Sequence, residues 1–414
     1  MPPARCGRWS WTWKPKAGSG CAGDWKKSCK LKSTATAEFF PQSGRQAWHR
    51  HRQAMHLRTA FGLVALTVWH GKNPAEGRWG CPIRERWGLS PHQQLSPALE
   101  DKLADFATVT GSYEAAAKLA AKVGCPVEDS TICELVQRLG AKAEAQTQAR
   151  LETTPEEQHP ARAPTPLAVL MVDGFQVRFR GPGWGKKKTP QPRVEWHEEK
   201  LGVFYRQEQA VPGERGQLLE KVMIGWQGEG GELGRRLHWE ALRGGLGRAQ
   251  AVLAVADGAP WIWNVVADRW GHAQQLLDFY HASQQLWTVG EALHPQDEPA
   301  RRAWVEARLP RLRHGKEQAV LREIAALPRH RGAVGKVIRR EQNYFAAHAG
   351  RMNYQAVADQ GWPIGSGTAE SGCRSRQGRR KRPGQFWTRP GLRHLDALEE
   401  ARDHGHWDEL WLAA

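Results

Sequence analysis

The sequence predicts an α/β protein in which a mainly helical N-terminal region precedes a region that contains a sheet. Residues 167–172 and 251–256 are continuous apolar runs, and each is followed at once by Asp-Gly. Short apolar runs of this kind are typical of strands that are buried on both faces. Helical spacing of apolar residues dominates 97–151 and 294–350. Helices are therefore expected both before and between the strands.

The composition favours a polyanionic partner. The chain has 414 residues, enough for two or three domains, and 60 Lys+Arg against 43 Asp+Glu give a net charge of +17. An excess of this size favours nucleic acid or an anionic membrane surface. No apolar run approaches the roughly 18–20 residues that span a bilayer, and no signal peptide is recognised, so a soluble nucleic-acid-binding protein without a membrane association is expected. The seven cysteines include no Cys-x-x-Cys pair, which predicts reduced thiols in a cytoplasmic protein.

The first domain is expected to follow a basic arm. Residues 1–58 carry 12 Lys+Arg against 2 Asp+Glu and many Gly, Ser and Pro. This low-complexity arm either binds the DNA backbone or, as the composition favours, is a disordered tail or an extension from a misassigned start. Residues 59–70 then have the composition of one or two strands of a hairpin.

Three helices are predicted next, and their boundaries follow from capping residues. Ser96 is suited to cap a helix over 97–110, and Ser112 a second helix over 113–123 that Gly124 closes. A third begins at 129–130, reaches Gly140 and is able to continue to Leu151. A helix, a short turn and a second helix form the pattern of a helix-turn-helix, so residues 59–152 are interpreted as a DNA-binding domain. The alternative is a small helical bundle without DNA binding, because it has the same pattern. Residues 153–166, with four prolines, are predicted to be a linker.

The second domain is predicted to begin with an antiparallel meander. The strand over 167–172 ends at Asp173, residues 175–180 alternate as a second strand, and a Lys/Gly/Pro loop leads to a third strand within 194–207. Further along the chain we expect a mainly helical 217–242, a strand over 251–256, a short helix from 261, a strand over 275–278, a helix over 282–293 and a helical insertion up to about 350.

Three carboxylates lie at the ends of predicted strands or in the first turn of a predicted helix. Asp173 and Asp257 follow the two apolar strands, and Glu370 lies in the first helical turn after the Gly/Ser-rich stretch 362–368. Attack on a phosphodiester is assisted by two divalent cations, and hard ions such as Mg²⁺ prefer carboxylate oxygens. The three acids are therefore candidate metal ligands. Alternatively, each Asp-Gly is an ordinary turn, Glu370 only favours the helix N-terminus, and other acids compete: Glu198, Glu199, Asp268 and Asp278.

A basic run follows Glu370 directly and is interpreted as a clamp on the DNA strand that is cut. Its members are Arg374, Arg376, Arg379, Arg380, Lys381 and Arg382. A pair of carboxylates also suits a glycosidase, but sugars do not require cations beside the acids.

The residues around these acids resemble a known family. The stretches 255–263, 277–282 and 363–371, together with 351–354 and 385–387, resemble bacterial insertion-sequence transposases of the ISKra type, which are DDE enzymes distantly related to the Mutator-like group. The resemblance covers roughly residues 59–412. It implies a ribonuclease-H-like catalytic domain over 167–412 with a helical insertion at about 283–350. It also implies two Mg²⁺ (or Mn²⁺) ions and cleavage and joining of DNA at the ends of the element.

When the family's residues are carried over by position, the resemblance implies that Asp173, Asp257 and Glu370 are the catalytic and metal-binding acids. Asp278 and His281 fall where Mutator-like relatives have Cys-x-x-His, so they are candidate supporting residues, or an ordinary helix start. The implied partners are double-stranded DNA at the terminal repeats and target, and further copies of the chain in a dimer or larger synaptic assembly in the bacterial nucleoid. The alternative function is a catalytically inactive or domesticated DNA-binding protein derived from a transposase.

Overall fold

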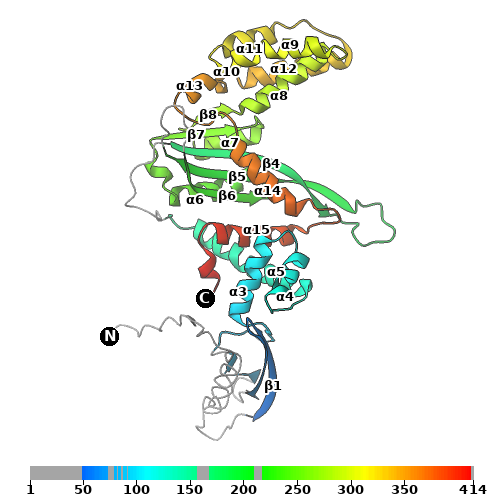
Figure 1. Cartoon of the computed structure of the whole chain (residues 1–414), viewed down its shortest axis with the longest axis vertical. Helices are drawn as coiled ribbons and strands as arrows, with labels where there is room; N and C mark the ends of the chain where they lie inside the picture. Colours follow the sequence, from blue (N-terminus) through cyan, green and yellow to red (C-terminus); the bar gives the residue numbers. More distant parts are fainter. Residues whose placement is uncertain are drawn as a thin grey trace. The chain divides into compact units, whose positions relative to one another are not determined.

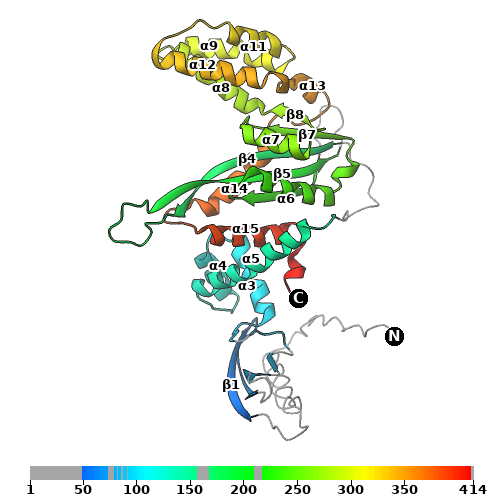
Figure 2. The same ribbon diagram turned by 180° about the vertical axis from the view of Figure 1, so that it is seen from behind.

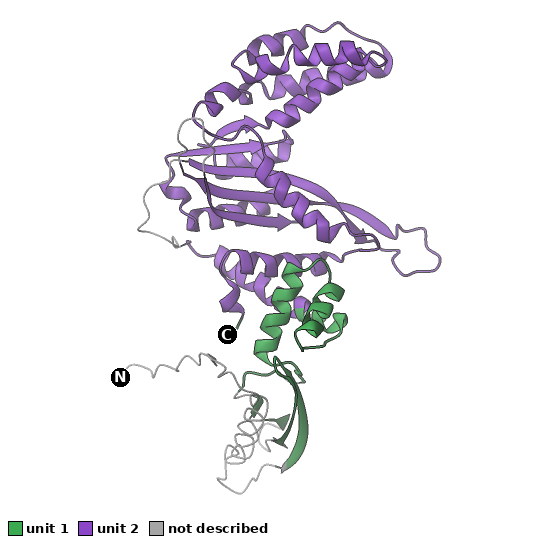
Figure 3. Ribbon diagram, viewed as in Figure 1, with its two compact units in different colours: residues 1–135, 411–414 green, residues 136–410 purple. Residues whose placement is uncertain are grey.

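The computed structural model of the chain describes residues 49–72, 79–81, 83–84, 87–90, 92–155, 167–208 and 217–411 (Figure 1). The chain divides into two compact units, one formed by Met1–Leu135 with Trp411–Ala414 and the other by Val136–Leu410 (Figure 3). The sequence placed the boundary in the linker 153–166 instead. Residues 1–48 of the predicted basic arm and residues 156–166 of the predicted linker lie outside the described residues.

The first described residues of the first unit form a three-stranded antiparallel sheet. Its strands are β1 (His49–Thr59), β2 (Gly62–Lys72) and β3 (Trp79–Gly80). β1 and β2 pair along their whole length, from His49 opposite Lys72 to Thr59 opposite Gly62. The assignment of residues 49–58 to the basic arm is therefore wrong. Met55 belongs to a small apolar core with Val64, Leu66 and Val68 of β2, and Leu57 is also buried, although the strand is otherwise rich in His and Arg.

The predicted helices of this region are confirmed. They are α3 (Pro97–Val109), α4 (Tyr113–Lys122) and α5 (Asp129–Leu151), the last of which contributes to both units. The hydroxyls of Ser96 and Ser112 accept the N–H groups of Leu99 and Ala115, as expected for N-caps.

The second unit contains a mixed five-stranded sheet in the order β6-β5-β4-β7-β8, which confirms the α/β prediction. Its strands are β4 (Leu167–Arg180), β5 (Val194–Gln207), β6 (Leu218–Trp226), β7 (Ala251–Ala256) and β8 (Gln274–Leu277). The first three form an antiparallel meander, and β7 and β8 are parallel to β4. The second unit also contains a series of helices: α6 (Gly230–Arg243), η2 (Leu246–Arg248), α7 (Pro260–Arg269), α8 (Phe279–Leu293), α9 (Glu298–Glu306), α10 (Leu309–Arg313), α11 (Glu317–Ala325), α12 (Gly332–Ala347), η3 (Ala349–Arg351), α13 (Tyr354–Ala358), α14 (Gly367–Arg380), α15 (Arg389–Asp403) and η4 (Trp407–Trp411).

Two strand predictions were wrong. Residues 167–180 form one strand and not two, because the backbone stays extended through Asp173-Gly174 and pairs with β5 throughout. β6 was expected to be part of a helix, but Lys200–Gln207 of β5 offers it a partner edge, and Val222 and Ile224 are buried. Tertiary pairing thus outweighed the local pattern in both places.

Helices cover both faces of this sheet, which explains why β4 and β7 are apolar throughout. α14 packs on β4 and β5 from one side, and α6 packs on β5 and β6 from the other, as the front and back views show (Figure 1, Figure 2). The helical insertion α9–α12 follows α8, as predicted. None of the described helices combines the length and the apolar character that crossing a membrane requires.

Candidate active site

Asp173 and Asp257 lie side by side because of the strand register. β4 and β7 are parallel, Val172 is opposite Ala256, and each aspartate is the next residue of its strand or loop. Burial raises the pKa of Asp173, and the negative charge of Asp257 raises it further. Two carboxylates that share a partly buried place repel one another, and such an arrangement favours the binding of a cation.

The loop after β7 holds Asp257 in a fixed conformation. The Asp257 Oδ1 atom accepts the N–H of Ala259 at 2.9 Å. Gly258 has a φ of +98°, and a Cβ there would lie 2.9 Å from the His348 Nε2 atom. The hydroxyl of Tyr344 donates to the carbonyl oxygen of Asp257 at 2.9 Å. The second acid is therefore anchored by α12 of the helical insertion, a contact that nothing in the sequence pattern indicated.

Asp278 joins the start of α8 to the turn that precedes α14. Its side chain is fully buried, and its Oδ1 atom accepts the N–H groups of Tyr280 and His281 at 2.6 and 3.0 Å. Its Oδ2 atom accepts both the N–H and the hydroxyl of Ser366. A Cβ at position 365 would lie 2.7 Å from the ring of Tyr280, so a larger residue there would have to displace that ring.

Glu370 lies next to Asp278 and His281. One ligand atom from each of these three residues lies within 4.8 Å of the other two. Across the described ranges from residue 49 to 411, this is the one group of three or more His, Cys, Asp and Glu with that spacing. The positive form of His281 also lowers the pKa of Asp173. His281 therefore connects the Glu370 group to the aspartate pair, and the structure brings all five predicted residues into one region.

The five residues differ in how many hydrogen bonds their side chains already make. The oxygens of Asp278 already accept four hydrogen bonds, so this residue positions its neighbours. Asp173 uses Oδ1 for the N–H of Gly174 at 2.7 Å, and Asp257 uses Oδ1 for Ala259. The Asp173 carboxylate also accepts a hydrogen bond from the thiol of Cys373. Asp173, Asp257 and Glu370 carry the hard oxygen donors that Mg²⁺ and Mn²⁺ prefer, but the described group whose ligand atoms lie within 4.8 Å of one another is Asp278, His281 and Glu370.

Cys373 is a further residue of the site that the sequence did not single out. Its thiol shares a hydrogen bond with the Asp173 carboxylate, and burial together with the charge of Asp173 raises the pKa of the thiol. Cys373 therefore stays protonated and can donate. It follows Glu370 by three residues in α14, so both residues face β4. The spacing of three residues from Glu370 on one helix was the feature of the sequence that could have identified Cys373.

The basic run after Glu370 contains both exposed and buried side chains. Arg374, Lys381 and Arg382 are exposed. Arg376, Arg379 and Arg380 are buried, so the prediction that these three side chains clamp DNA is wrong. Helical periodicity is the reason, since these three lie on the side of α14 that packs against the sheet and α15.

A buried ion-pair network occupies the inner side of α14. The guanidinium groups of Arg376 and Arg380 lie 3.2 and 3.0 Å from Oε1 of Glu199, and both contact Asp396. Arg380 also pairs with Glu399 at 2.7 Å. The network fixes α14, and with it Glu370, against β5 and α15.

The competing acids have structural partners. Glu199 belongs to the buried network. Glu198 pairs with Lys200 at 2.9 Å on β5, and Asp268 pairs with Arg269 near the end of α7 with 64% of its side chain exposed. Glu198 nevertheless lies next to Gly174, the residue after Asp173, because a Cβ on Gly174 would be 2.7 Å from the Glu198 Oε1 atom, so Glu198 stays a competing acid.

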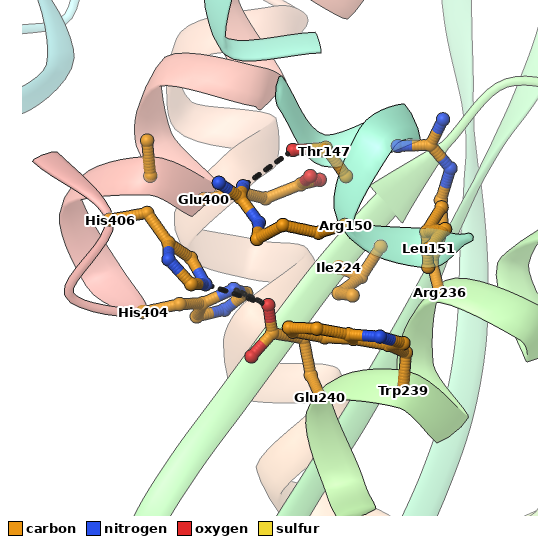
Figure 4. Close-up of a pocket in the computed structure, with 11 residues that line it drawn as sticks. Thr147, Arg150, Leu151, Ile224, Arg236, Trp239, Glu240, Glu400, His404 and His406 are labelled. Atoms are coloured by element: carbon orange, nitrogen blue, oxygen red, sulfur yellow. Dashed lines mark hydrogen bonds and ion pairs between the residues drawn. The ribbon is translucent and has the colours of Figure 1, made fainter. Parts of the chain in front are cut away.

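A separate small cavity lies between α5, α6 and α15 and is not part of this site (Figure 4). Its volume of about 10 Å³ is close to the minimum for one water molecule. Within its lining, Glu240 accepts a hydrogen bond from His406 at 3.1 Å, and Arg150 donates to Thr147 at 2.9 Å. We assign this cavity a structural role.

Comparisons with known proteins give little. No protein-family model and no curated protein matches the chain. Among solved structures, the chain is similar to the Drosophila P element transposase strand transfer complex, with 10% identity, 80% of this chain and 82% of that chain covered, and a TM-score of 0.26. A likeness this weak carries no weight beside the geometry of the site.

Proposed function

We propose that the protein is a DDE-type transposase that cleaves and transfers DNA strands in a metal-dependent reaction. The observation that carries the proposal is the pairing of Asp173 and Asp257 at adjacent parallel strands, with Glu370 brought to the same region by α14. The mixed sheet, a meander followed by parallel strands, supports a ribonuclease-H-like domain. The resemblance of the surrounding sequence to ISKra-type transposases agrees with this function.

The proposed roles follow from where each side chain is held. Asp173, Asp257 and Glu370 would hold two Mg²⁺ or Mn²⁺ ions, whose chemistry is to neutralise charge on the attacking and leaving oxygens of a phosphodiester. β4 and β7 keep the two aspartates adjacent. Cys373 orients Asp173, and Asp278 fixes the turn from which Glu370 emerges.

DNA is the proposed partner because of charge. The net charge is +17. Arg374 is exposed one turn after Glu370, and Lys381 and Arg382 are exposed at the end of α14. We propose that DNA at the element's ends and at the target binds here, and that two or more copies of the chain assemble to hold two ends. Binding through phosphates predicts a steep loss of affinity as salt rises.

The test is strand cleavage of DNA that carries the sequences flanking the gene, with purified protein and Mg²⁺. Asp257→Asn and Glu370→Gln should each lower cleavage by roughly a thousandfold or more, because a metal ligand is lost, while DNA binding stays intact. Asp268→Asn is the matched control and should cleave like the unchanged protein. Cleavage retained in either acid variant would refute the assignment.

The alternative is a DNA-binding protein that has lost catalysis. All three acids are present in the sequence, and Asp173 and Asp257 follow paired parallel strands, which speaks against it. Binding of the flanking DNA without any Mg²⁺- or Mn²⁺-dependent cleavage would favour this alternative.

A further inference from the structure

The hairpin formed by β4 and β5 extends well past the rest of the sheet. β7 pairs with β4 only as far as Val172, and β6 pairs with β5 only from Lys200 onward. Residues 174–180 and 194–199 therefore form a two-stranded ribbon, and residues 181–193 connect its ends. We name residues 174–199 the arm, which is distinct from the basic N-terminal arm predicted for residues 1–58. Both views show it projecting from the sheet (Figure 1, Figure 2).

The segment between α14 and α15 stabilises the arm. The N–H of Arg180 donates to the carbonyl oxygen of Trp387 at 2.9 Å, and the N–H of Trp387 donates to that of Arg178 at 3.0 Å. The Arg178 guanidinium donates to the carbonyl oxygen of Arg382 at 2.5 Å. The arm is thus held by the same stretch that follows the candidate third acid.

One face of the arm carries alternating aromatic rings and guanidinium groups. The Arg178 guanidinium carbon lies 5.9 Å from the ring of Trp196 and 5.1 Å from the ring of Phe386. The rings of Phe386 and Trp184 are 4.7 Å apart, and Arg180 lies 5.4 Å from the ring of Trp184. We call these five residues the ladder. Both indoles remain accessible, since Trp196 is 55% and Trp184 40% exposed.

The surroundings of the ladder are strongly basic. The arm contains three glutamates, of which Glu199 belongs to the buried network, Glu198 pairs with Lys200 and Glu195 lies 3.0 Å from His197, and residues 381–390 contain no acid. Exposed cations in these two segments are Arg180, Lys186, Lys187, Lys188, Arg193, Lys381, Arg382 and Arg389. An acidic protein surface would pair with the cations but offers no flat bases to the rings, whereas a nucleic-acid backbone neutralises the cations and its bases stack on the rings.

We propose that the arm binds an unpaired DNA strand that continues from the cleavage site. A duplex hides the faces of its bases within the stack, so exposed indole rings gain stacking energy chiefly from unpaired bases. Arg180 lies seven residues along β4 from Asp173, about 23 Å at about 3.3 Å per residue, so a strand that continues along β4 from the acids reaches the ladder.

The choice of DNA as the nucleic acid rests on the proposed function. The test uses fluorescence anisotropy in EDTA, so that no strand is cut, with two probes: an oligo(dT) strand of about 30 nucleotides and a mixed-sequence duplex of about 30 base pairs. Trp196→Ala should weaken oligo(dT) binding roughly tenfold, the effect of losing one stacked base. Trp196→Phe, the matched control, keeps a ring and should bind within about threefold of the unchanged protein. Duplex affinity should change little in both variants.

The outcomes separate the two proposals. Trp184→Ala provides an independent arm variant with the same expected result if Trp196→Ala proves unstable in thermal unfolding. An equal loss for both probes, or no loss for either, would overturn the stacking proposal. If cleavage depends on Asp257 but oligo(dT) binding does not depend on Trp196, only the arm proposal is refuted. Trp196-dependent strand binding without cleavage would remove the proposed transposase activity alone.

Discussion

The carboxylate of Asp278 accepts hydrogen bonds from both the backbone N–H and the hydroxyl of Ser366, 88 residues later in the chain. The contact fixes the start of α8 to the turn that opens α14. Since Glu370 is four residues beyond Ser366, the position of the candidate third acid depends on this buried pair. The relationship makes Asp278 a positioning residue.

Ser366→Ala should therefore lower both stability and cleavage. The substitution removes one donor to a buried carboxylate, at a cost of about 2 kcal/mol in the free energy of unfolding. Cleavage should fall as well, by up to about 100-fold, because Glu370 is less precisely held. Urea unfolding and a strand-cleavage assay measure the two effects. Ser371→Ala, at an exposed position of the same helix, is the control and should change neither. A Ser366→Ala protein with unchanged stability would contradict the role given to this contact.

Two arginines close together in sequence should behave differently. Arg380→Ala leaves Glu199 and Asp396 buried with a lost partner, so it should lower the free energy of unfolding by about 3–5 kcal/mol. Arg382→Ala lies at an exposed position and should change stability by less than about 0.5 kcal/mol, yet weaken DNA binding. Denaturant titration and DNA-binding measurements on both variants test the division of the basic run. Equal stability of the two variants would show that the buried network is not structural.

Asp173→Asn should stabilise the protein when no divalent cation is present. Burial and the charge of Asp257 raise the pKa of Asp173, so its contribution to stability is present below the unfolded pKa and lost as pH rises through the folded pKa. At neutral pH the charge is unfavourable, and removing it should raise the thermal midpoint by roughly 1–3 °C in EDTA. Added Mg²⁺ should raise the midpoint of the unchanged protein but much less that of Asp173→Asn. Asp268→Asn should match the unchanged protein in both conditions, and a full Mg²⁺ response in Asp173→Asn would count against the metal site.

Acid should weaken the contact between α6 and the C-terminal residues. Burial alone would raise the pKa of Glu240, but the hydrogen bond from His406 and the charges of His404 and Arg243 outweigh it and lower the pKa to about 2. A lowered carboxyl pKa gives stability that is present above the unfolded value of about 4.3 and is lost as pH falls toward 2. Glu240→Gln should be less stable near neutral pH and should lose less stability between about pH 5 and pH 3.

Denaturant titrations across this pH range provide the measurement. The exposed Glu229→Gln at the start of α6 is the control and should follow the pH dependence of the unchanged protein. The role of Glu240 would be refuted by a Glu240→Gln protein whose stability falls as steeply in acid as that of the control.

Local patterns determined much of the fold. The apolar runs at 167–172 and 251–256 are strands because only a sheet covered on both faces accommodates them, and Ser96 and Ser112 cap helices because their hydroxyls replace missing partners of the first N–H groups. The same reasoning missed β6, whose strand conformation depends on the edge of β5. It also divided β4 at Asp173-Gly174, where pairing keeps the backbone extended.

The sequence by itself determined which acids deserve consideration, because Asp173 and Asp257 each follow a buried strand and Glu370 opens a helix. Only the tertiary structure decided which residues accompany them. The register of β4 and β7 places the two aspartates side by side, and the packing of α14 brings Cys373 to Asp173 and hides Arg376, Arg379 and Arg380. Sequence spacing records the order of side chains along the chain, whereas pairing and helix packing set which of them meet and which remain exposed to a partner.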